Sequence, residues 1–257
     1  MTVGSLGQAV ELLVRRPDQT GIFTDFDGTL SEIVDEPGQA VPVEGAARAL
    51  TELSDRFARV GVLSGRPVSF LARWFGPGVL VSGLYGLELV VDGQRLDHPL
   101  GGVWREVVDD VATQSRARGP EGMRVESKGL SLTLHYRGRP EREADVRRWA
   151  QTQASRSGLD LRPARLSYEL HPPIDVDKGT SLLELVDDLA AVCFLGDDVG
   201  DLPVFDALDL LAARGVETLR IGVRSPEVAA ELTERADLMV DGPAGAVEVL
   251  QALAAAS

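Results

Sequence analysis

The stretch Asp25-Phe26-Asp27-Gly28-Thr29-Leu30 decides the fold of this chain. It follows the apolar run Gly21-Ile22-Phe23-Thr24, which predicts a buried strand of a parallel sheet. The strand is therefore followed by two carboxylates with one residue between them, and Gly28-Thr29 then turns the chain. In open α/β sheets, ligands bind outside the carboxyl ends of the strands. Two acids at this place are costly unless positive charge neutralises them, so the stretch indicates a site for a divalent cation and a phosphoryl group.

The two carboxylates suit phosphoryl transfer. Asp25 is placed to attack phosphorus and form an aspartyl-phosphate. Asp27 lies one step along the loop, where it can protonate the leaving alcohol and later take a proton from water. Gly28 lets the backbone come close to the phosphate. The simpler alternative is an ordinary strand-to-loop turn with an Asp capping the next segment, and three downstream clusters argue against it.

Two of these clusters can bind an anion. Ser64-Gly65-Arg66 follows a predicted strand, where a hydroxyl and backbone N–H groups can hold a phosphoryl oxygen. Lys178 stands in Asp177-Lys178-Gly179-Thr180 at a predicted helix N-terminus. Its charge can neutralise the nucleophile and the phosphate together, and the helix dipole assists. Taken singly, the first cluster is more often a turn and the second a surface lysine.

The third cluster can bind a metal ion. Gly196-Asp197-Asp198-Val199-Gly200-Asp201 follows an apolar strand and places three carboxylates within five positions. Oxygen ligands of this kind suit a hard cation, and magnesium prefers one or two protein carboxylates together with substrate phosphate and water. A solvated loop that caps the next helix is the alternative interpretation of this cluster alone.

Composition excludes several classes of function. The net charge of −14 argues against nucleic acid or an anionic membrane as partner, and an anionic substrate then needs locally placed cations. One Cys and three His exclude a disulfide framework and a Cys/His zinc site. No apolar run is long enough for a membrane span, and the N-terminus lacks a signal-peptide pattern. We therefore expect a cytoplasmic protein, by default a monomer.

The order of elements predicts an α/β fold with an insertion. Residues 1–100 and 175–257 alternate between helix and strand, which indicates a parallel sheet between helices. Residues 101–174 change to helix, hairpin, helix, hairpin, the pattern of a small α+β domain. We predict helices over 5–15, 42–53, 67–75, 103–117, 140–157, 180–189, 201–212, 226–234 and 243–255, and strands over 21–24, 58–63, 79–81, 87–91, 94–96, 123–126, 131–136, 159–162, 166–170, 191–195, 218–223 and 238–240.

Taken together, the order Asp-x-Asp-Gly-Thr, Ser-Gly, Lys and Gly-Asp-Asp-x-x-Asp resembles the four motifs of the haloacid dehalogenase-like superfamily of phosphatases. The resemblance covers the whole α/β portion. It implies a Rossmann-like parallel-sheet core with an inserted cap of the C2 type. It also implies that Asp25 is the nucleophile, Asp27 the general acid and base, Ser64 the motif hydroxyl and Lys178 the motif cation. The implied Mg2+ ligands are Asp25, the main chain of Asp27, Asp197 and Asp198, with Asp201 nearby.

The insertion must choose the leaving group, and its sequence resembles the cap of the trehalose-phosphate phosphatases. Residues 124–137 match that family's Glu-x-Lys, Ser and His-Tyr-Arg pattern, with Glu126 and Lys128 as the first pair. Residues 82–88 resemble its Gly-x-His-Gly-x-Glu segment, and Glu169 before Pro172 resembles its Glu-x-x-Pro segment. Paired acids and a lysine can satisfy sugar hydroxyls, which both donate and accept. The resemblance thus implies hydrolysis of trehalose 6-phosphate, a small-molecule sugar phosphate, with substrate contacts at Gly65, Arg66, Tyr85, Gly86, Glu126, Lys128 and Glu169.

One departure leaves alternatives open. Tyr85 stands where the family usually has His. Tyr can still hydrogen-bond to a sugar or stack on it, yet another ester is then possible, such as a mannosyl-glycerate, sucrose or pseudo-disaccharide phosphate. Glu126 and Lys128 could also be a simple pair on the exposed face of a strand. A non-catalytic phospho-receiver or sugar-phosphate sensor is the remaining hypothesis, although neither Asp27 nor a large cap is needed for that role.

Overall fold

The computed structural model describes residues 5–34, 36–164, 166–225 and 228–256. The chain divides into two compact units, Met1–Leu96 with Val176–Ser257, and Asp97–Asp175. The expected boundaries at 100/101 and 174/175 lie close to these positions. Among the described helices, none combines the length and the hydropathy that crossing a membrane requires.

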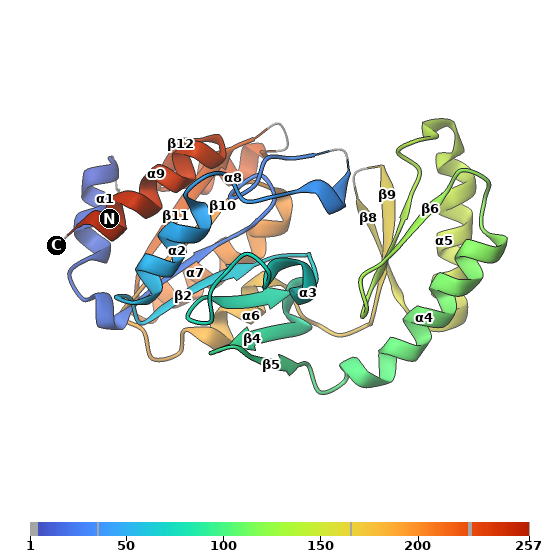
Figure 1. Ribbon diagram of the computed structural model, residues 1–257, viewed down its shortest axis with the longest axis horizontal. Coiled ribbons are helices and arrows are strands. Elements are labelled where there is room, and N and C mark those ends of the chain that lie inside the picture. Colours follow the sequence, from blue (N-terminus) through green and yellow to red (C-terminus); the bar gives the residue numbers. More distant parts are fainter. Residues whose placement is uncertain (1–4, 35, 165, 226–227, 257) are drawn as a thin grey trace. The chain divides into compact units, whose positions relative to one another are not determined.

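The larger unit is built on one mixed, mainly parallel sheet (Figure 1). Its strands are β1 (Thr20–Thr24), β2 (Arg59–Leu63), β3 (Leu80–Gly83), β4 (Glu88–Val91), β5 (Gln94–Asp97), β10 (Ala191–Gly196), β11 (Glu217–Arg224) and β12 (Leu238–Asp241). In the described residues the order is β12-β11-β10-β1-β2-β3-β4-β5, parallel from β12 to β3, with β4 antiparallel to β3. Because β1 lies between β10 and β2, the segments that follow these three strands meet at one edge of the sheet.

Helices cover both faces of this sheet. Neighbouring residues of β1 point to opposite faces, so Ile22 belongs to one hydrophobic core and Phe23 to the other, both without exposed surface. The first core includes α1 (Leu6–Leu13), α2 (Ala46–Ser54), α3 (Val68–Leu71) and α9 (Gly242–Ala255), and the second includes α6 (Lys178–Leu185), α7 (Leu202–Ala213) and α8 (Ala230–Arg235). Burial on both faces explains the continuous apolar runs of the central strands.

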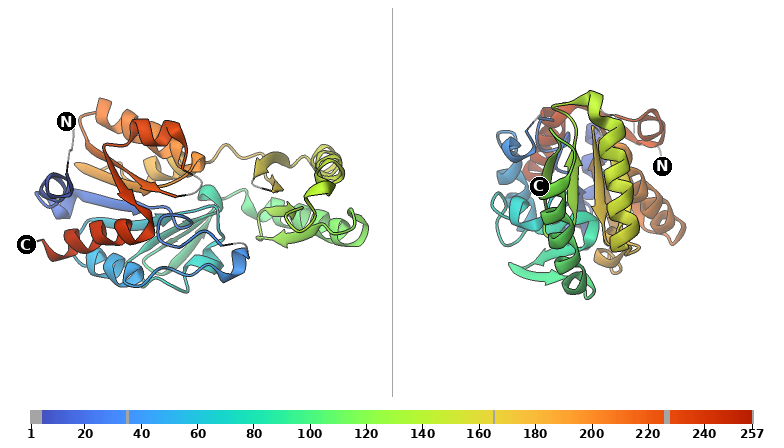
Figure 2. Two further views of the ribbon diagram at one scale, coloured as in Figure 1. Left: turned by 90° about the horizontal axis from the view of Figure 1, so that it is seen from above. Right: turned by 90° about the vertical axis from the view of Figure 1, so that its right-hand side faces the viewer.

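The smaller unit is an antiparallel sheet with two helices on one face (Figure 2). Its elements are α4 (Gly101–Arg118), β6 (Arg124–Ser127), β7 (Leu132–His135), α5 (Glu143–Ser157), β8 (Asp160–Ala164) and β9 (Ser167–His171), with strand order β6-β7-β9-β8. Leu134 and Leu170 pack in one core with Val108 of α4 and Val146 of α5. The alternate residues form the other face, where the register sets Glu126, Thr133, Glu169 and Arg162 in one row across the strands.

Several element boundaries differ from the sequence-based expectation. The helix expected from residue 42 begins at Ala46, because the segment before it stays extended: Pro42 pairs with Ser31, and the Val43 N–H donates to the Leu30 carbonyl over 2.8 Å. The helix expected over 67–75 ends at Leu71. The helix expected over 226–234 starts in residues 226–227, which lie outside the described residues, and α8 begins at Ala230. Short 3-10 segments occur at Pro17–Gln19, Pro37–Gln39, Leu84–Gly86, Pro140–Arg142 and Val199–Asp201.

Candidate active site

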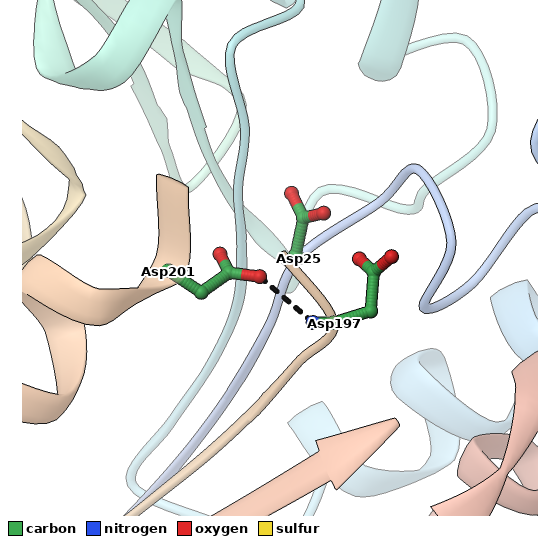
Figure 3. Close-up of side chains that lie close together, drawn as sticks. All are labelled: Asp25, Asp197 and Asp201. Carbon is green, nitrogen blue, oxygen red and sulfur yellow. Dashed lines mark hydrogen bonds between the residues drawn. The ribbon is translucent and has the colours of Figure 1, made fainter. Parts of the chain in front are cut away.

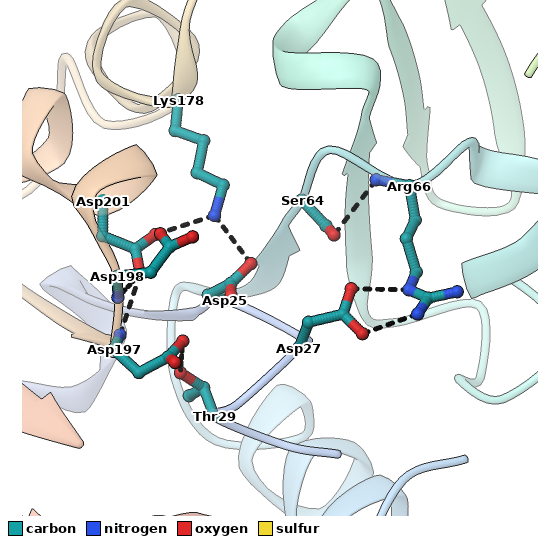
Figure 4. Close-up of polar contacts among 9 residues, drawn as sticks. All are labelled: Asp25, Asp27, Thr29, Ser64, Arg66, Lys178, Asp197, Asp198 and Asp201. Carbon is teal, nitrogen blue, oxygen red and sulfur yellow. Dashed lines mark hydrogen bonds and ion pairs between the residues drawn. The ribbon is translucent and has the colours of Figure 1, made fainter. Parts of the chain in front are cut away.

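Asp25 and Lys178 form a buried ion pair at the carboxyl edge of the larger sheet (Figure 4). Asp25 follows β1, and its N–H still donates to the Leu195 carbonyl of β10 over 2.8 Å, which fixes the backbone. Lys178 is the first residue of α6, whose N-terminus is held by a capping box between Asp177 and Thr180. The Lys178 Nζ donates to Asp25 Oδ1 over 2.7 Å. Both side chains are 5% exposed, so this cation lies directly on the expected nucleophile.

Asp201 connects Lys178 to the acidic loop. Its Oδ1 accepts from Lys178 Nζ over 2.7 Å, and its Oδ2 accepts from the backbone N–H of Asp197 over 2.9 Å and of Asp198 over 3.3 Å. The residue has no exposed surface. Sequence reasoning placed Asp201 only near the metal site. Its position as the last acid of the Gly-Asp-Asp-x-x-Asp pattern was the signal for this larger role.

The acidic loop and Asp25 form a cluster that could bind a metal ion (Figure 3). Carboxylate oxygens of Asp25, Asp197 and Asp201 lie within 4.8 Å of one another, and all three residues are buried. Among the described residues, Asp198 Oδ1 is buried without a hydrogen-bond partner. Buried oxygen ligands with an unsatisfied member fit a hard divalent cation. Asp197, an expected ligand, thus lies with Asp25 in this group, whereas Asp201 rather than the expected Asp198 is its third member.

The charge balance of the cluster also favours an added cation. Burial, and then the neighbouring Asp201, raises the pKa of Asp197 to about 7. Burial raises the pKa of Asp25 well above its usual range, although Lys178 opposes the shift. Burial alone would lower the pKa of Lys178, but Asp201 and Asp25 more than reverse this effect and hold it well above its usual range. The single positive charge of Lys178 therefore does not neutralise the carboxylates of the cluster. A bound divalent cation would supply the missing positive charge.

Gly28 and Thr29 contact the Asp197 carboxylate of the acidic cluster. Thr29 Oγ1 donates to Asp197 Oδ1 over 3.3 Å, a contact that sequence reasoning did not anticipate. Gly28 has φ +78°, and a Cβ built on it would lie 2.0 Å from Asp197 Oδ2. The glycine expected to face the phosphate thus also makes room for the Asp197 carboxylate.

We expect Gly28→Ala to disrupt the metal cluster. The methyl group would displace the Asp197 carboxylate, and a misplacement of about 1 Å near the reacting groups costs on the order of 100-fold in rate. Gly215→Ala is the matched control, because Gly215 also has positive φ, +90°, but a Cβ added there would meet nothing within 4 Å. Both variants should lose about 1 kcal/mol to backbone strain. Metal titration and phosphate release should separate them, and equal losses in both would contradict this role of Gly28.

Ser64, Gly65 and Tyr85 pack closely against one another after β2. Ser64 follows β2, is 2% exposed, and accepts the Arg66 N–H on its Oγ over 3.2 Å. A Cβ on Gly65 would lie 2.6 Å from the Tyr85 ring, so the ring packs on the Gly65 backbone. Tyr85 itself has φ 60° and ψ 22°, a left-handed conformation that is rare for a bulky residue. Gly86 follows with φ +111°, and its Cα faces the Ser181 hydroxyl.

Asp27 is paired with Arg66 rather than with Lys178 (Figure 4). Arg66 Nε donates to Asp27 Oδ2 over 2.5 Å, and a terminal guanidinium nitrogen donates to Oδ1 over 2.6 Å. The other terminal nitrogen donates to the Pro37 carbonyl over 2.6 Å. The two acids of the first motif therefore have different cationic partners, from different elements.

The expected sugar contacts of the smaller unit lie together on the polar face of its sheet. Glu169 is 4% exposed and accepts from Lys128 Nζ over 3.3 Å and from the Ser131 hydroxyl over 3.0 Å. Glu126 is paired with His135, with 2.7 Å between Oε2 and Nε2. Lys128 and Glu169 thus form one pair on this face, and Glu126 and His135 form another.

Comparison with known proteins identifies the class and then the family. The fold is that of haloacid dehalogenase-like hydrolases: one such protein from Bacteroides thetaiotaomicron superposes with a TM-score of 0.63 at 15% identity, over 90% of this chain and 98% of that one. The C-terminal domain of C. albicans trehalose-6-phosphate phosphatase superposes with a TM-score of 0.74 at 22% identity, over 100% and 99% of the two chains. The sequence model of the Trehalose-phosphatase family matches residues 23–238, so the chain belongs to that family.

A sequence relative gives the same family. The trehalose-phosphate phosphatase of Mycobacterium ulcerans (strain Agy99) is 36% identical over 216 residues, which cover 79% of this chain and 54% of the relative. The chain thus spans about half the length of this curated relative.

Proposed function

We propose that this chain is a Mg2+-dependent phosphomonoesterase that hydrolyses trehalose 6-phosphate to trehalose and phosphate. The observation that carries the proposal is the arrangement around Asp25, which meets Lys178 on one side and the Asp197–Asp201 cluster on the other. Membership of the Trehalose-phosphatase family and the name of the M. ulcerans relative support the choice of substrate.

The proposed reaction has two half-reactions. In the first, a carboxylate oxygen of Asp25 attacks phosphorus, the bond from phosphorus to the sugar oxygen breaks, and Asp27 gives that oxygen a proton. In the second, water attacks phosphorus of the aspartyl-phosphate, Asp27 takes the proton, and phosphate leaves with Asp25 regenerated. Lys178 and the Ser64 hydroxyl are proposed to hold phosphoryl oxygens.

The proposed metal ligands combine two members of the buried acidic cluster, Asp25 and Asp197, with the further ligands that the family resemblance implies. Asp25, Asp197, Asp198 and the main-chain carbonyl of Asp27 are the proposed ligands. A bound Mg2+ would offset the negative charge of the phosphoryl group and of the carboxylates around it. Asp201 is assigned a positioning role, because its oxygens already accept from Lys178 and from two backbone N–H groups.

The proposed sugar contacts lie in two places. Glu126, Lys128 and Glu169 of the smaller unit would exchange their present hydrogen bonds for bonds to sugar hydroxyls. In the larger unit, Gly65, Tyr85 and Gly86 are the proposed contacts. Tyr85 favours a second candidate, hydrolysis of another sugar monophosphate, because its ring packs on Gly65 where the family usually has an imidazole.

The deciding experiment measures phosphate release with Mg2+, with and without chelator, from trehalose 6-phosphate and a panel of sugar monophosphates. Selective turnover of the trehalose ester supports the proposal. Turnover of another ester alone keeps the chemistry and overturns the substrate. A chain that releases no phosphate from any ester, yet forms a stable aspartyl-phosphate, would instead be a receiver or sensor.

We expect Glu169→Gln to impair sugar recognition without impairing the chemistry. The amide loses the negative charge that pairs with Lys128 and replaces one accepting oxygen with a donor, and a hydrogen bond to a charged group contributes about 1.5–3 kcal/mol. The ratio kcat/KM for trehalose 6-phosphate should therefore fall at least about tenfold, while that for 4-nitrophenyl phosphate stays unchanged. Glu141→Gln, at a side chain that is 64% exposed in the same unit, is the control. An equal loss for both esters would place Glu169 outside sugar recognition.

A further inference from the structure

Arg66 occupies a position in which all of its guanidinium nitrogens are engaged by the protein. Two of them donate to the two oxygens of Asp27 over 2.5 and 2.6 Å, and the third donates to the Pro37 carbonyl over 2.6 Å. The Arg66 side chain is 13% exposed, whereas that of Asp27 is 40% exposed. The sequence led us to expect Arg66 at the substrate, but the geometry directs it to a residue of the first motif.

Two aromatic rings fix the plane of this guanidinium. The Arg66 Cζ lies 4.2 Å from the Phe70 ring centroid and 5.5 Å from that of Phe26. The two rings are themselves packed edge to face, 5.8 Å apart at 84°. Phe26 stands between Asp25 and Asp27 in the chain, so the same residue supports Arg66 and anchors the loop that carries both acids. A planar, stacked fork of this kind is a feature of Arg that Lys does not reproduce.

We infer that Arg66 is a positioning residue for Asp27, the proposed general acid and base, and not a ligand of the phosphoryl group. A bidentate guanidinium sets both the direction and the rotation of a carboxylate. When Asp27 carries the proton for the leaving oxygen, one carboxyl oxygen can still accept from Arg66 while the other presents the O–H. When Asp27 is to take a proton from water, the full pair holds it as the carboxylate. The inference rests on the proposed phosphatase function.

A double-mutant cycle tests this assignment. The ratio kcat/KM for the ester that the unmodified protein hydrolyses best is measured in Arg66→Met, Arg66→Lys, Asp27→Asn and the double variant Arg66→Met/Asp27→Asn. If Arg66 acts through Asp27, Arg66→Met should lose at least about tenfold, a part of the roughly 10²–10⁴-fold that general acid–base catalysis supplies. The same substitution should then cost nothing further once Asp27 is Asn. Arg66→Lys should recover only part of the loss, because it keeps the charge and not the fork.

A second measurement separates positioning from phosphate binding without needing turnover. Calorimetric titration with inorganic phosphate in the presence of Mg2+ should give the same Kd for Arg66→Met as for the unmodified protein. Arg73→Met is the matched control, because Arg73 also stacks on Phe70, at 4.1 Å, but is exposed and is not bonded to Asp27. The inference would be overturned if Arg66→Met lowered kcat/KM in the Asp27→Asn background as much as in the unmodified protein and also weakened phosphate binding. Arg66 would then be a substrate ligand. If the unmodified protein turns over no ester, the proposed function fails instead, and with it the reaction that Arg66 would serve.

Discussion

Asp25→Asn is expected to reduce phosphate release by about four or more orders of magnitude, a loss typical of removing a catalytic nucleophile. The carboxylate oxygen that meets Lys178 becomes part of an amide, which does not attack phosphorus. The fold should persist, because Asn has nearly the same shape and the Asp25 backbone keeps its bond to Leu195. Thermal stability should not fall, since the change removes a buried acid whose pKa burial has raised. Phosphate release at high protein concentration and a melting curve give both quantities.

The control for this variant is Asp55→Asn, an exposed acid at the end of α2. It should leave phosphate release unchanged. Turnover by Asp25→Asn within a factor of about ten of the unmodified protein would exclude Asp25 as the nucleophile. Covalent phosphate that still forms in this variant would lead to the same conclusion.

Removing the divalent cation is expected to stop turnover and to lower the melting temperature at neutral pH. A cation present at about 100 times its Kd adds about 2.7 kcal/mol of stability. For a chain of this size that corresponds to roughly 5–10 °C. The shift should be larger at pH 8 than at pH 5, because protons compete with the metal for Asp197, whose pKa burial raises to about 7.

The metal-free protein should show the matching pH dependence. The pKa of Asp197 is about 7 in the folded chain, against a reference value of 3.8, so folding retains a proton that the unfolded chain releases. The contribution of this group to stability is therefore fully present below about pH 4 and is lost as the pH rises through about 7. Melting curves between pH 4 and 8, with Mg2+ and with chelator, measure both effects. A metal-induced shift that is constant across this range would contradict a site built on Asp197.

The sequence predicted the fold class, and it predicted that Asp25 lies near Lys178 and the acidic loop, because both depend on local patterns. Apolar runs without polar interruption indicated strands buried on both faces, and in a parallel sheet the residues after such strands meet at one edge. Asp25 and Asp197 are brought together in this way, and Lys178 joins Asp25 from the first turn of α6. The expected start of α2 was wrong because Pro42 and Val43 bond to Ser31 and Leu30, a pairing that helix propensity does not encode.

The contacts that sequence reasoning missed are those between side chains from different motifs. Nothing in Ser64-Gly65-Arg66 alone shows that the guanidinium turns to Asp27, which lies 39 positions earlier. Likewise, the sequence placed Asp201 only near the metal site, and its bonds to Lys178 and to two backbone N–H groups became visible only in the structure. Such choices depend on rotamers and on competing acceptors, which motif spacing leaves open.

The order of the strands in the larger sheet also constrains the order in which parts of the chain can fold. The smaller unit, Asp97–Asp175, is continuous and has a hydrophobic core of its own, so its contacts form between residues that are near in the chain. In the larger unit, the central strand β1 pairs with β10 through partners such as Thr20 and Ala191, with the entire smaller unit in between. Closing so long an interval is slow compared with local pairing. During synthesis, the half of the sheet that begins with β1 must therefore wait, with one edge unpaired, until β10 and the acidic loop have left the ribosome.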